Sequence, residues 1–435
     1  MAQIPLDPPF TKGKVESDHL NAHTSIPTFA KGGPGGISAA FVSTNSITQG
    51  EQVGVLWPDL LRHGVQLHFA HRTFQWMNEA KGKAAVHCVI IGFGLQEAAH
   101  KIIFEYADIQ GKPHAIPANN INPYLVDAPN VVLENRTYPI CDVPKMINGS
   151  KPADGGNLLL SDEEKHELLI AEPQAEKWIR PFIGADEFIN NIPRWCLWLV
   201  DISPAELRTM PQIMQRVEAV RTMRLASKDA QTIKDAVTPT LFQKIRQPTE
   251  PYLLVPSVSS ENRLYVPIGY LLPEVIVSNL VYSIPNATLY HFGILTSTMH
   301  NAWMRTVCGR LKSDYRYSVG IVYNNFPWPE IPPLTKGGGA QHGGISAIET
   351  AAQAVLDARA QFPDSTLADL YDPLAMPPEL VHVHQALDRA VDAAYGKKNF
   401  ASEAERVAFL FERYQAITSL LPAVSAKKTK KPQSS

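Results

Sequence analysis

The amino-acid sequence predicts an α/β protein in three parts: part of a Rossmann-like open sheet, a mixed α+β domain and a small helical domain. Residues 39–105 have the order strand, helix, strand, strand. Residues 106–330 hold many short apolar runs and many prolines, and three amphipathic helices follow residue 347. With 435 residues and 45% hydrophobic content, the chain has enough apolar side chains for two or three domains.

The segment 39–105 resembles the second half of an open α/β sheet. It contains a strand in AAFVSTN, a helix ending near Gly64, and strands in VQLHFAHRTF and KAAVHCVIIGFG. The last strand is almost entirely apolar, as expected for a strand covered on both faces. Because open α/β sheets bind ligands at the carboxyl ends of their strands, we expect Thr44, Asn45 and Ser46 to lie at a binding edge.

The middle domain, residues 106–330, contains two segments with excess positive charge. Gln215–Arg246 looks helical and basic, and a solvated helix surface is the ordinary explanation. His300–Pro329, HNAWMRTVCGRLKSDYRYSVGIVYNNFPWP, combines basic residues with aromatics in a chain of net charge −2. This pattern favours a polyanion-binding face, and the alternative is a solvated helix end that runs into an ordinary strand.

The remaining segments are simpler. Residues 1–38 are rich in glycine and proline and are expected to be poorly ordered, and residues 331–346 repeat the same phrase as a linker. Helices are expected across residues 347–424, where Ser402 and Glu405 have the spacing of a capping box. A basic tail, residues 425–435, ends the chain.

Several classes of protein are disfavoured by composition. No apolar run approaches the roughly 20 residues that cross a bilayer, and the first residues lack the layout of a secretion signal. The four cysteines are scattered without a CxxC pair, which argues against a zinc site or a disulfide framework. We therefore expect a cytoplasmic protein with no metal site and no membrane association.

Four blocks carry a resemblance to a known family. They are FVSTNSITQGEQV, HFAHRTFQWMNEAKGKAAVHCVIIGF, the His300–Pro329 stretch, and LADLYDPLAMPPEL followed by AERVAFLF. In this order they resemble the carboxy-terminal half of the MmeI-like DNA adenine methyltransferases. The resemblance implies the distal half of a methyltransferase domain at 39–105, a DNA target recognition domain at 106–330 and a C-terminal helical domain.

The family's chemistry requires S-adenosylmethionine and a catalytic tetrad of Asn or Asp, two prolines and an aromatic residue. Asp7, Pro8, Pro9 and Phe10 have this spelling, but the same segment reads equally as one copy of the Gly/Pro-rich phrase. The Gly-rich cofactor turn is not identifiable, because Gly92 and Gly94 follow a strand that belongs late in the sheet. Most of the cofactor site is therefore expected to be missing from this chain, and the cofactor-binding residues are unknown.

The resemblance also suggests residues that contact DNA. Phe74 stands where related enzymes stack an aromatic side chain on the extruded base, although it also reads as a buried aromatic between strands. In the loop LKSDYRYS, Ser313, Asp314 and Arg316 are expected to read bases, unless Asp314 and Arg316 only form a salt bridge. Three further cations are expected at the DNA, with the two arginines on phosphates: Arg305, Arg310 and Lys312.

The sequence thus predicts a site-specific adenine-N6 DNA methyltransferase, present as a partial chain that retains mainly DNA recognition. Its expected partners are double-stranded DNA and the missing N-terminal methyltransferase half. The alternative is a non-enzymatic DNA-binding specificity module or the remnant of a decayed gene. A fused nuclease has no support, since no PD-(D/E)xK-type strand is identifiable.

Overall fold

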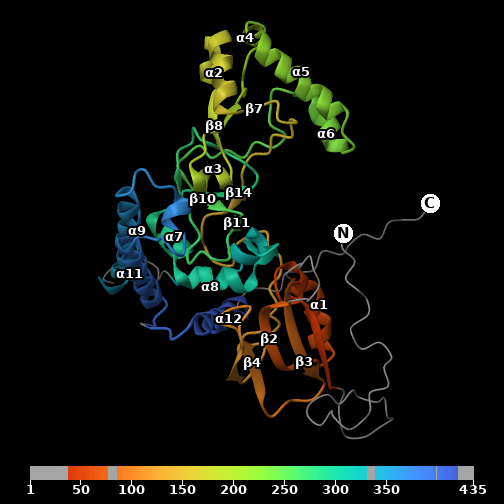
Figure 1. The fold of residues 1–435 in the computed structure, drawn as a ribbon, viewed down its shortest axis with the longest axis vertical. Helices are drawn as coiled ribbons and strands as arrows, with labels where there is room; N and C mark the ends of the chain where they lie inside the picture. Colours follow the sequence, from red (N-terminus) through yellow and green to blue (C-terminus); the bar gives the residue numbers. More distant parts are fainter. Residues whose placement is uncertain (1–37, 77–85, 331–338, 398, 420–435) are drawn as a thin grey trace, which may run out of the picture.

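The computed structural model describes residues 38–76, 86–330, 339–397 and 399–419. Figure 1 shows an elongated molecule with a sheet at one end, helices packed on one side of the centre, and a separate lobe at the other end. This distal lobe, residues 150–246, carries the helices α2 to α6. The predicted tetrad Asp7–Phe10 and the basic tail lie outside the described residues.

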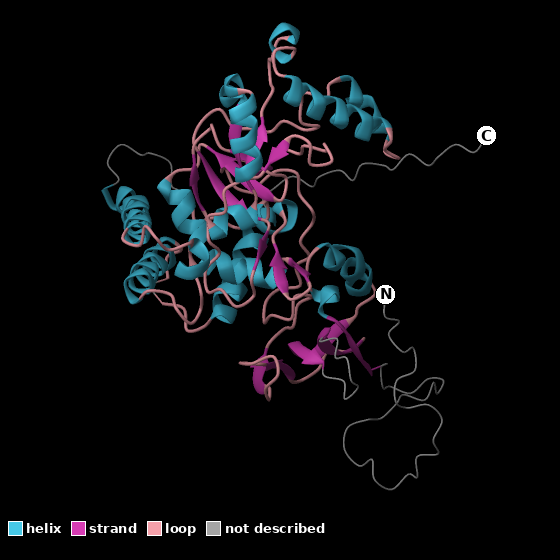
Figure 2. Ribbon diagram, turned by 45° about the horizontal axis from the view of Figure 1, so that its top comes forward, coloured by secondary structure: helices cyan, strands magenta, loops and turns pink. Residues whose placement is uncertain are grey.

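The first sheet confirms the predicted order of strand, helix, strand, strand. It has the order β1-β3-β2-β4-β5, and β3 runs antiparallel to both β1 and β2. Its strands are β1 (Ser38–Thr44), β2 (Gln66–Trp76), β3 (Val86–Gly94), β4 (Lys101–Glu105) and β5 (His114–Ala118), and helix α1 (Glu51–Arg62) joins β1 to β2. In Figure 2 these strands gather at one end of the molecule. The two glycines of β3 therefore belong to a strand that is paired on both sides, next to the edge strand β1.

Packing explains why β3 carries a glycine at position 92. Gly92 pairs with Phe69 of β2, and a Cβ atom built on Gly92 would lie 2.0 Å from the Phe69 ring. The ring occupies the space of the missing side chain, so Gly92 has a structural role. On α1, Val53 and Trp57 are buried, and the Trp57 indole donates to the Ile47 carbonyl oxygen at 2.6 Å.

The middle domain contains three small sheets instead of one large one. Their strand orders are β12-β10-β14-β6, β11-β16-β15 and β13-β8-β9-β7. The strands are β6 (Ile147–Asn148), β7 (Leu159–Leu160), β8 (Ile179–Ile183), β9 (Trp195–Leu197), β10 (Tyr252–Pro256), β11 (Val258–Ser259), β12 (Gly269–Leu271), β13 (Ile276–Val277), β14 (Val281–Pro285), β15 (Gly309–Leu311) and β16 (Asp314–Arg316). The helices are α2 (Asp162–Ala171), α3 (Ala185–Asn190), α4 (Pro204–Leu207), α5 (Pro211–Leu225), α6 (Ala230–Lys234), α7 (Leu289–Thr296) and α8 (Thr298–Val307).

The first part of the His300–Pro329 stretch is core and not a charged face. Most of α8 is buried, including His300, Asn301 and Trp303. The Trp303 ring lies 5.1 Å from that of Phe411, which belongs to the last helix. Aromatic side chains are frequent here because α8 is covered on nearly every side. Only the hairpin that follows, β15–β16, reaches the surface.

Four helices form the C-terminal part: α9 (Gly339–Ala360), α10 (Leu367–Leu370), α11 (Pro378–Ala394) and α12 (Glu403–Ser419). The boundary expected between linker and helix at residue 347 was wrong, since α9 begins at Gly339. Ile345 is partly buried against the core and Ile348 is fully buried, so packing extends the helix into the glycine-rich segment. Among the described residues, no helix is both long and apolar enough to cross a membrane.

Candidate nucleic-acid interface

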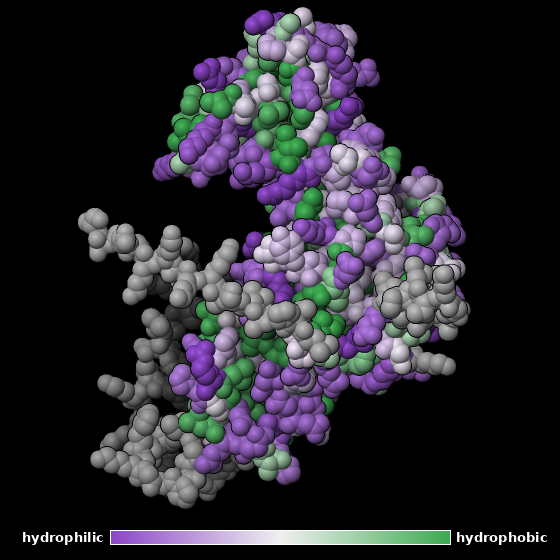
Figure 3. Space-filling model, turned by 180° about the vertical axis from the view of Figure 1, so that it is seen from behind, coloured by the Kyte–Doolittle hydropathy of each residue, from purple (hydrophilic) through white to green (hydrophobic). Residues whose placement is uncertain are grey.

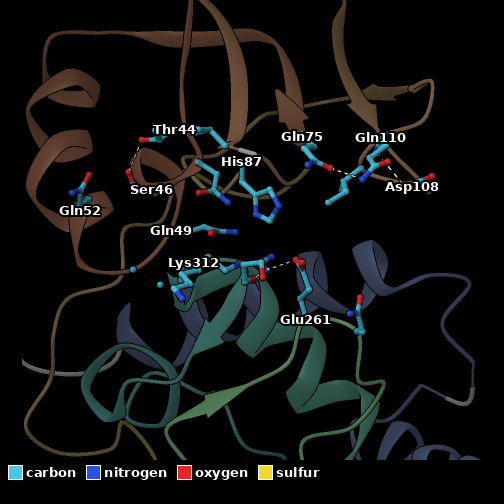
Figure 4. A pocket seen from close by; sticks show the side chains of 18 of the residues that line it. Thr44, Ser46, Gln49, Gln52, Gln75, His87, Asp108, Gln110, Glu261 and Lys312 are labelled. Atoms are coloured by element: carbon cyan, nitrogen blue, oxygen red, sulfur yellow. Dashed lines mark hydrogen bonds and ion pairs between the residues drawn. The ribbon is translucent and has the colours of Figure 1, made fainter. Parts of the chain in front are cut away.

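A cavity of about 880 Å³ lies between the first sheet and the β15–β16 hairpin (Figure 4). Its walls come from segments far apart in the sequence: the ends of β1 and β2, the start of β3, the loop after β4 and the hairpin. Most of the residues that line it are polar, with amide, hydroxyl, imidazole and carboxylate side chains. It therefore offers hydrogen-bond donors and acceptors suited to a polar ligand.

The carboxyl end of β1 contributes Thr44, Asn45 and Ser46, as expected for a binding edge of an open sheet. The Thr44 and Ser46 hydroxyl oxygens lie 2.9 Å apart, within hydrogen-bonding distance. Asn45 is buried, and its Nδ2 has no hydrogen-bond partner among the described residues. A buried amide donor without a partner is costly unless a bound group accepts from it.

The opposite wall holds amide side chains that the sequence did not single out. Gln110 donates from Nε2 to Oε1 of Gln75 at 2.6 Å, and its backbone N–H donates to Asp108 at 3.0 Å. His87, from the start of β3, lines the same cavity. Each is an ordinary surface-type residue in the sequence, and only the pairing of β2 with β3 and β4 brings them together.

The hairpin β15–β16 closes the cavity from the middle domain. Its two-residue turn places Lys312 at φ 57°, in the left-handed region, and leaves this side chain exposed at the tip. Lys312, Ser313 and Arg310 line the cavity. Within the described residues, no carboxylate lies within 4 Å of the Lys312 ammonium group. Lys312 is therefore available to an anionic ligand.

The two arginines of the hairpin lie on opposite faces. Arg310 pairs with Tyr315 across the ladder and stacks on its ring at 3.9 Å, and its Nη1 lies 3.2 Å from Glu261. Because side chains alternate along a strand, Arg316 and Asp314 occupy the other face. Arg316 is exposed, and no ion pair joins it to Asp314 in the described structure. The alternative of an Asp314–Arg316 salt bridge was therefore wrong.

Arg305 is held inside the protein. Its Nη1 lies 2.8 Å from Glu403 of α12, and its Nη2 donates to the Leu264 carbonyl oxygen. Arg305 and Arg310 both line a smaller cavity of about 230 Å³ that Arg316 does not reach. These contacts join α8 to α12 and favour a structural role for Arg305, while the expected phosphate contact stays a prediction. The three arginines do not form one basic surface.

Phe74 lies near the end of β2, beside the cavity but not in its lining. Its ring stacks on that of Tyr106, with centroids 5.4 Å apart, and lies 6.2 Å from Trp76. By alternation, Phe74 and Trp76 face away from Gln75, which does line the cavity. The geometry favours the packed-aromatic reading of Phe74. Base stacking by Phe74 stays a prediction.

Sequence models of one family match most of the chain. The MmeI DNA-methyltransferase domain matches residues 28–105, the MmeI target recognition domain 127–330, and the MmeI C-terminal domain 341–422. A curated relative, "DNA methyltransferase A" of Bacillus subtilis (strain 168), is 43% identical over 380 residues. That match covers 87% of this chain and 41% of the relative.

A solved structure is also similar. It is that of the Type IIL restriction-modification enzyme MmeI in complex with DNA, with a TM-score of 0.80 and 53% sequence identity. The match covers 88% of this chain and 50% of the other. The chain thus spans half or less of the length of these two proteins.

Proposed function

Because the chain belongs to the MmeI family, we propose that it acts in the sequence-specific methylation of adenine N6 in duplex DNA. The observation that carries this proposal is the cavity shared by the carboxyl edge of the first sheet and the recognition hairpin. A nucleotide turned out of the duplex would need both surfaces at once, one for the base and one for the flanking strand. The partner is therefore double-stranded DNA, and the relative MmeI was solved in complex with DNA.

Arg316, Asp314 and Lys312 are the residues we assign to DNA recognition. Arg316 is exposed and without an ion pair in the described structure, so its guanidinium is available for bidentate bonds to guanine. Lys312 at the hairpin tip suits a phosphate, which contributes affinity without sequence information. Ser313 and Arg310, which line the cavity, complete this edge.

Selection from a pool of random duplexes tests these roles. Arg316→Ala is expected to relax preference at one base pair, at a cost of about 1–3 kcal/mol there. Lys312→Ala is expected to weaken binding to all duplexes by the same factor. If Arg316→Ala weakened binding to every duplex equally, Arg316 would be a phosphate contact. If both variants bound DNA as tightly as the wild type, the hairpin would be excluded from the interface.

We expect the described residues to lack most of the site for S-adenosylmethionine. The candidate glycines, Gly92 and Gly94, lie within strand β3 and not in a turn after it, and the Phe69 ring fills the space at Gly92. We therefore expect isothermal titration calorimetry of the purified chain with S-adenosylmethionine to show no heat of binding. Stoichiometric binding would overturn this assignment and would place the cofactor site within this chain.

The exposed edge of the first sheet indicates where the rest of the methyltransferase fold would join. In β1, Phe41 is 59% exposed and Val42 is 51% exposed, although both side chains are large and apolar. Apolar side chains on an edge strand are ordinarily covered by a neighbouring strand or helix. We propose that this edge packs against the cofactor-binding half of the methyltransferase domain. That half is expected to bind S-adenosylmethionine.

A DNA-binding specificity module without catalysis is the second candidate. It is favoured by the same absence of a cofactor turn among the described residues. An assay in which the cofactor-binding half of a related methyltransferase is added to this chain distinguishes the enzyme from the binding module. Restored methylation of a bound duplex supports the enzyme, whereas unchanged DNA binding without methylation supports the module. In either case the free thiols of all four cysteines fit a reducing compartment such as the cytoplasm.

A further inference from the structure

A short β-bridge in the distal lobe places two lysines directly opposite each other. Lys151 and Lys244 form an isolated antiparallel pair and exchange both backbone hydrogen bonds, at 2.9 and 3.1 Å. The side chains of such a pair project from the same face of the two paired segments. Both are exposed, and in the described structure neither ammonium group has a carboxylate within 4 Å. Repulsion between two facing cations with no ion-pair partner within 4 Å disfavours the fold.

Neighbouring groups add to this positive charge. The Arg246 backbone N–H donates to the Ser150 hydroxyl at 3.0 Å, so the exposed Arg246 lies beside the same paired segments. Lys151 helps to lower the pKa of Asp229, but hydrogen bonds from Thr232 are the larger cause. Because Asp229 caps the start of α6, its carboxylate is already engaged.

The buried guanidinium group of Arg224 holds the two bridged segments in place. Arg224 is fully buried, and it donates five hydrogen bonds to backbone carbonyl oxygens. Pro152 and Ala153, next to Lys151, accept two of them, and Leu241, before Lys244, accepts another. Burial lowers the pKa of Arg224, and Asp235 and Asp154 only partly offset this effect. The segments that carry Lys151 and Lys244 are therefore both held by hydrogen bonds to the positively charged Arg224.

From this arrangement we propose that Lys151 and Lys244, with Arg246, grip the phosphate backbone of duplex DNA. The proposal rests on the proposed DNA-binding function and adds a second contact surface, distant in sequence from the β15–β16 hairpin. In Figure 3 the distal lobe overhangs a hollow in the molecular surface, which leaves room for a duplex beside the main body. A phosphate between the two ammonium groups would remove their mutual repulsion.

The test compares binding of a random-sequence 30-base-pair duplex by the full chain and by Lys151→Ala/Lys244→Ala, across a salt series. Each lost phosphate contact lowers the slope of log K against log salt by about 0.9, so the double variant is expected to lose about 1–2 units of slope. Sequence preference should not change. The thermal midpoint should stay the same or rise, whereas a structural role for the pair would lower it.

A matched control removes two lysines that do have acidic partners, the exposed Lys177 with Glu206 and the partly exposed Lys397 with Glu405. Lys177→Ala/Lys397→Ala should retain the wild-type salt slope, and Lys151→Arg/Lys244→Arg should restore it. If the wild type binds DNA and the Lys151/Lys244 variant shows the same slope, or if the control loses as much, the phosphate grip is excluded. If the wild type does not bind duplex DNA, the proposed function itself fails.

Discussion

At the scale of single residues, burial separates groups that look alike in the sequence. His300 is buried and His291 is partly buried, and burial lowers the pKa of His300 to about 3 and that of His291 to about 4. The His300 ring lies 2.9 Å from the Tyr317 hydroxyl group, which is itself buried. Both histidines are therefore neutral in the folded protein at neutral pH, and neither is a candidate for binding phosphate.

These histidines predict how stability depends on pH. Protons bind to them more readily in the unfolded chain, since the ordinary pKa is 6.5 and the folded values are lower. Their contribution is complete above pH 6.5 and is lost as the pH falls toward 4, by at most about 1.4 kcal/mol per pH unit for each histidine. The thermal midpoint measured from pH 7.5 to 5 should fall, and His300→Gln should make that fall shallower.

The control for this prediction is the exposed His166. His166→Gln should leave the pH profile unchanged. Profiles of equal steepness for the wild type and His300→Gln would show that His300 is not the group responsible.

At the scale of elements, the hairpin β15–β16 shows how one short ladder serves two purposes. Its inner face carries Arg310 and Tyr315, which anchor it to Glu261. Its outer face carries Asp314 and the exposed Arg316, which we propose contact DNA. Rigid anchoring of the inner face holds the outer residues in place, as a recognition element requires.

The pairing of β2 with β3 gives a prediction at this scale. Gly92→Ala would place a Cβ atom 2.0 Å from an atom of the Phe69 ring, so the ring or the strand must shift. We expect a loss of stability of about 1–3 kcal/mol, seen as a lower thermal midpoint. Gly309→Ala is the matched control, because no atom lies within 4 Å of its added Cβ. Equal midpoints for the two variants would contradict the packing described for β3.

At the scale of the whole molecule, the hydrophobic core does not follow the three sequence regions. One core joins Val53 of α1, Trp303 of α8 and Leu410 of α12, so the first sheet, part of the middle domain and the C-terminal helices form a single packed body. The distal lobe has a separate core, which includes Leu197 and Val220. The middle domain is therefore divided between two physical units.

The described residues hold three hydrophobic clusters, and the two larger ones predict two unfolding transitions in scanning calorimetry. Leu197→Ala should lower one transition and Leu410→Ala the other, since each residue is fully buried in a different core. The expected loss is about 2–5 kcal/mol for each substitution. A single transition that both variants shift equally would show that the lobes unfold as one unit.

The sequence alone determined the local elements and the class of fold. Apolar alternation placed the strands and helix of residues 39–94, and capping and periodicity placed α11 and α12, because these patterns depend on near neighbours. The same local signals placed Thr44, Asn45 and Ser46 at a binding edge. They did not reveal Gln75, His87 or Gln110, which carry no local pattern.

Only the tertiary structure decided which cations are available to a ligand. Arg305 meets Glu403, 98 residues away, and Arg310 meets Glu261, 49 residues away. Lys151 meets Lys244 across a bridge that no periodicity predicts. Spacing along the chain reports the charge of a residue but not its partner, because ion pairs and burial are set by contacts between segments distant in sequence.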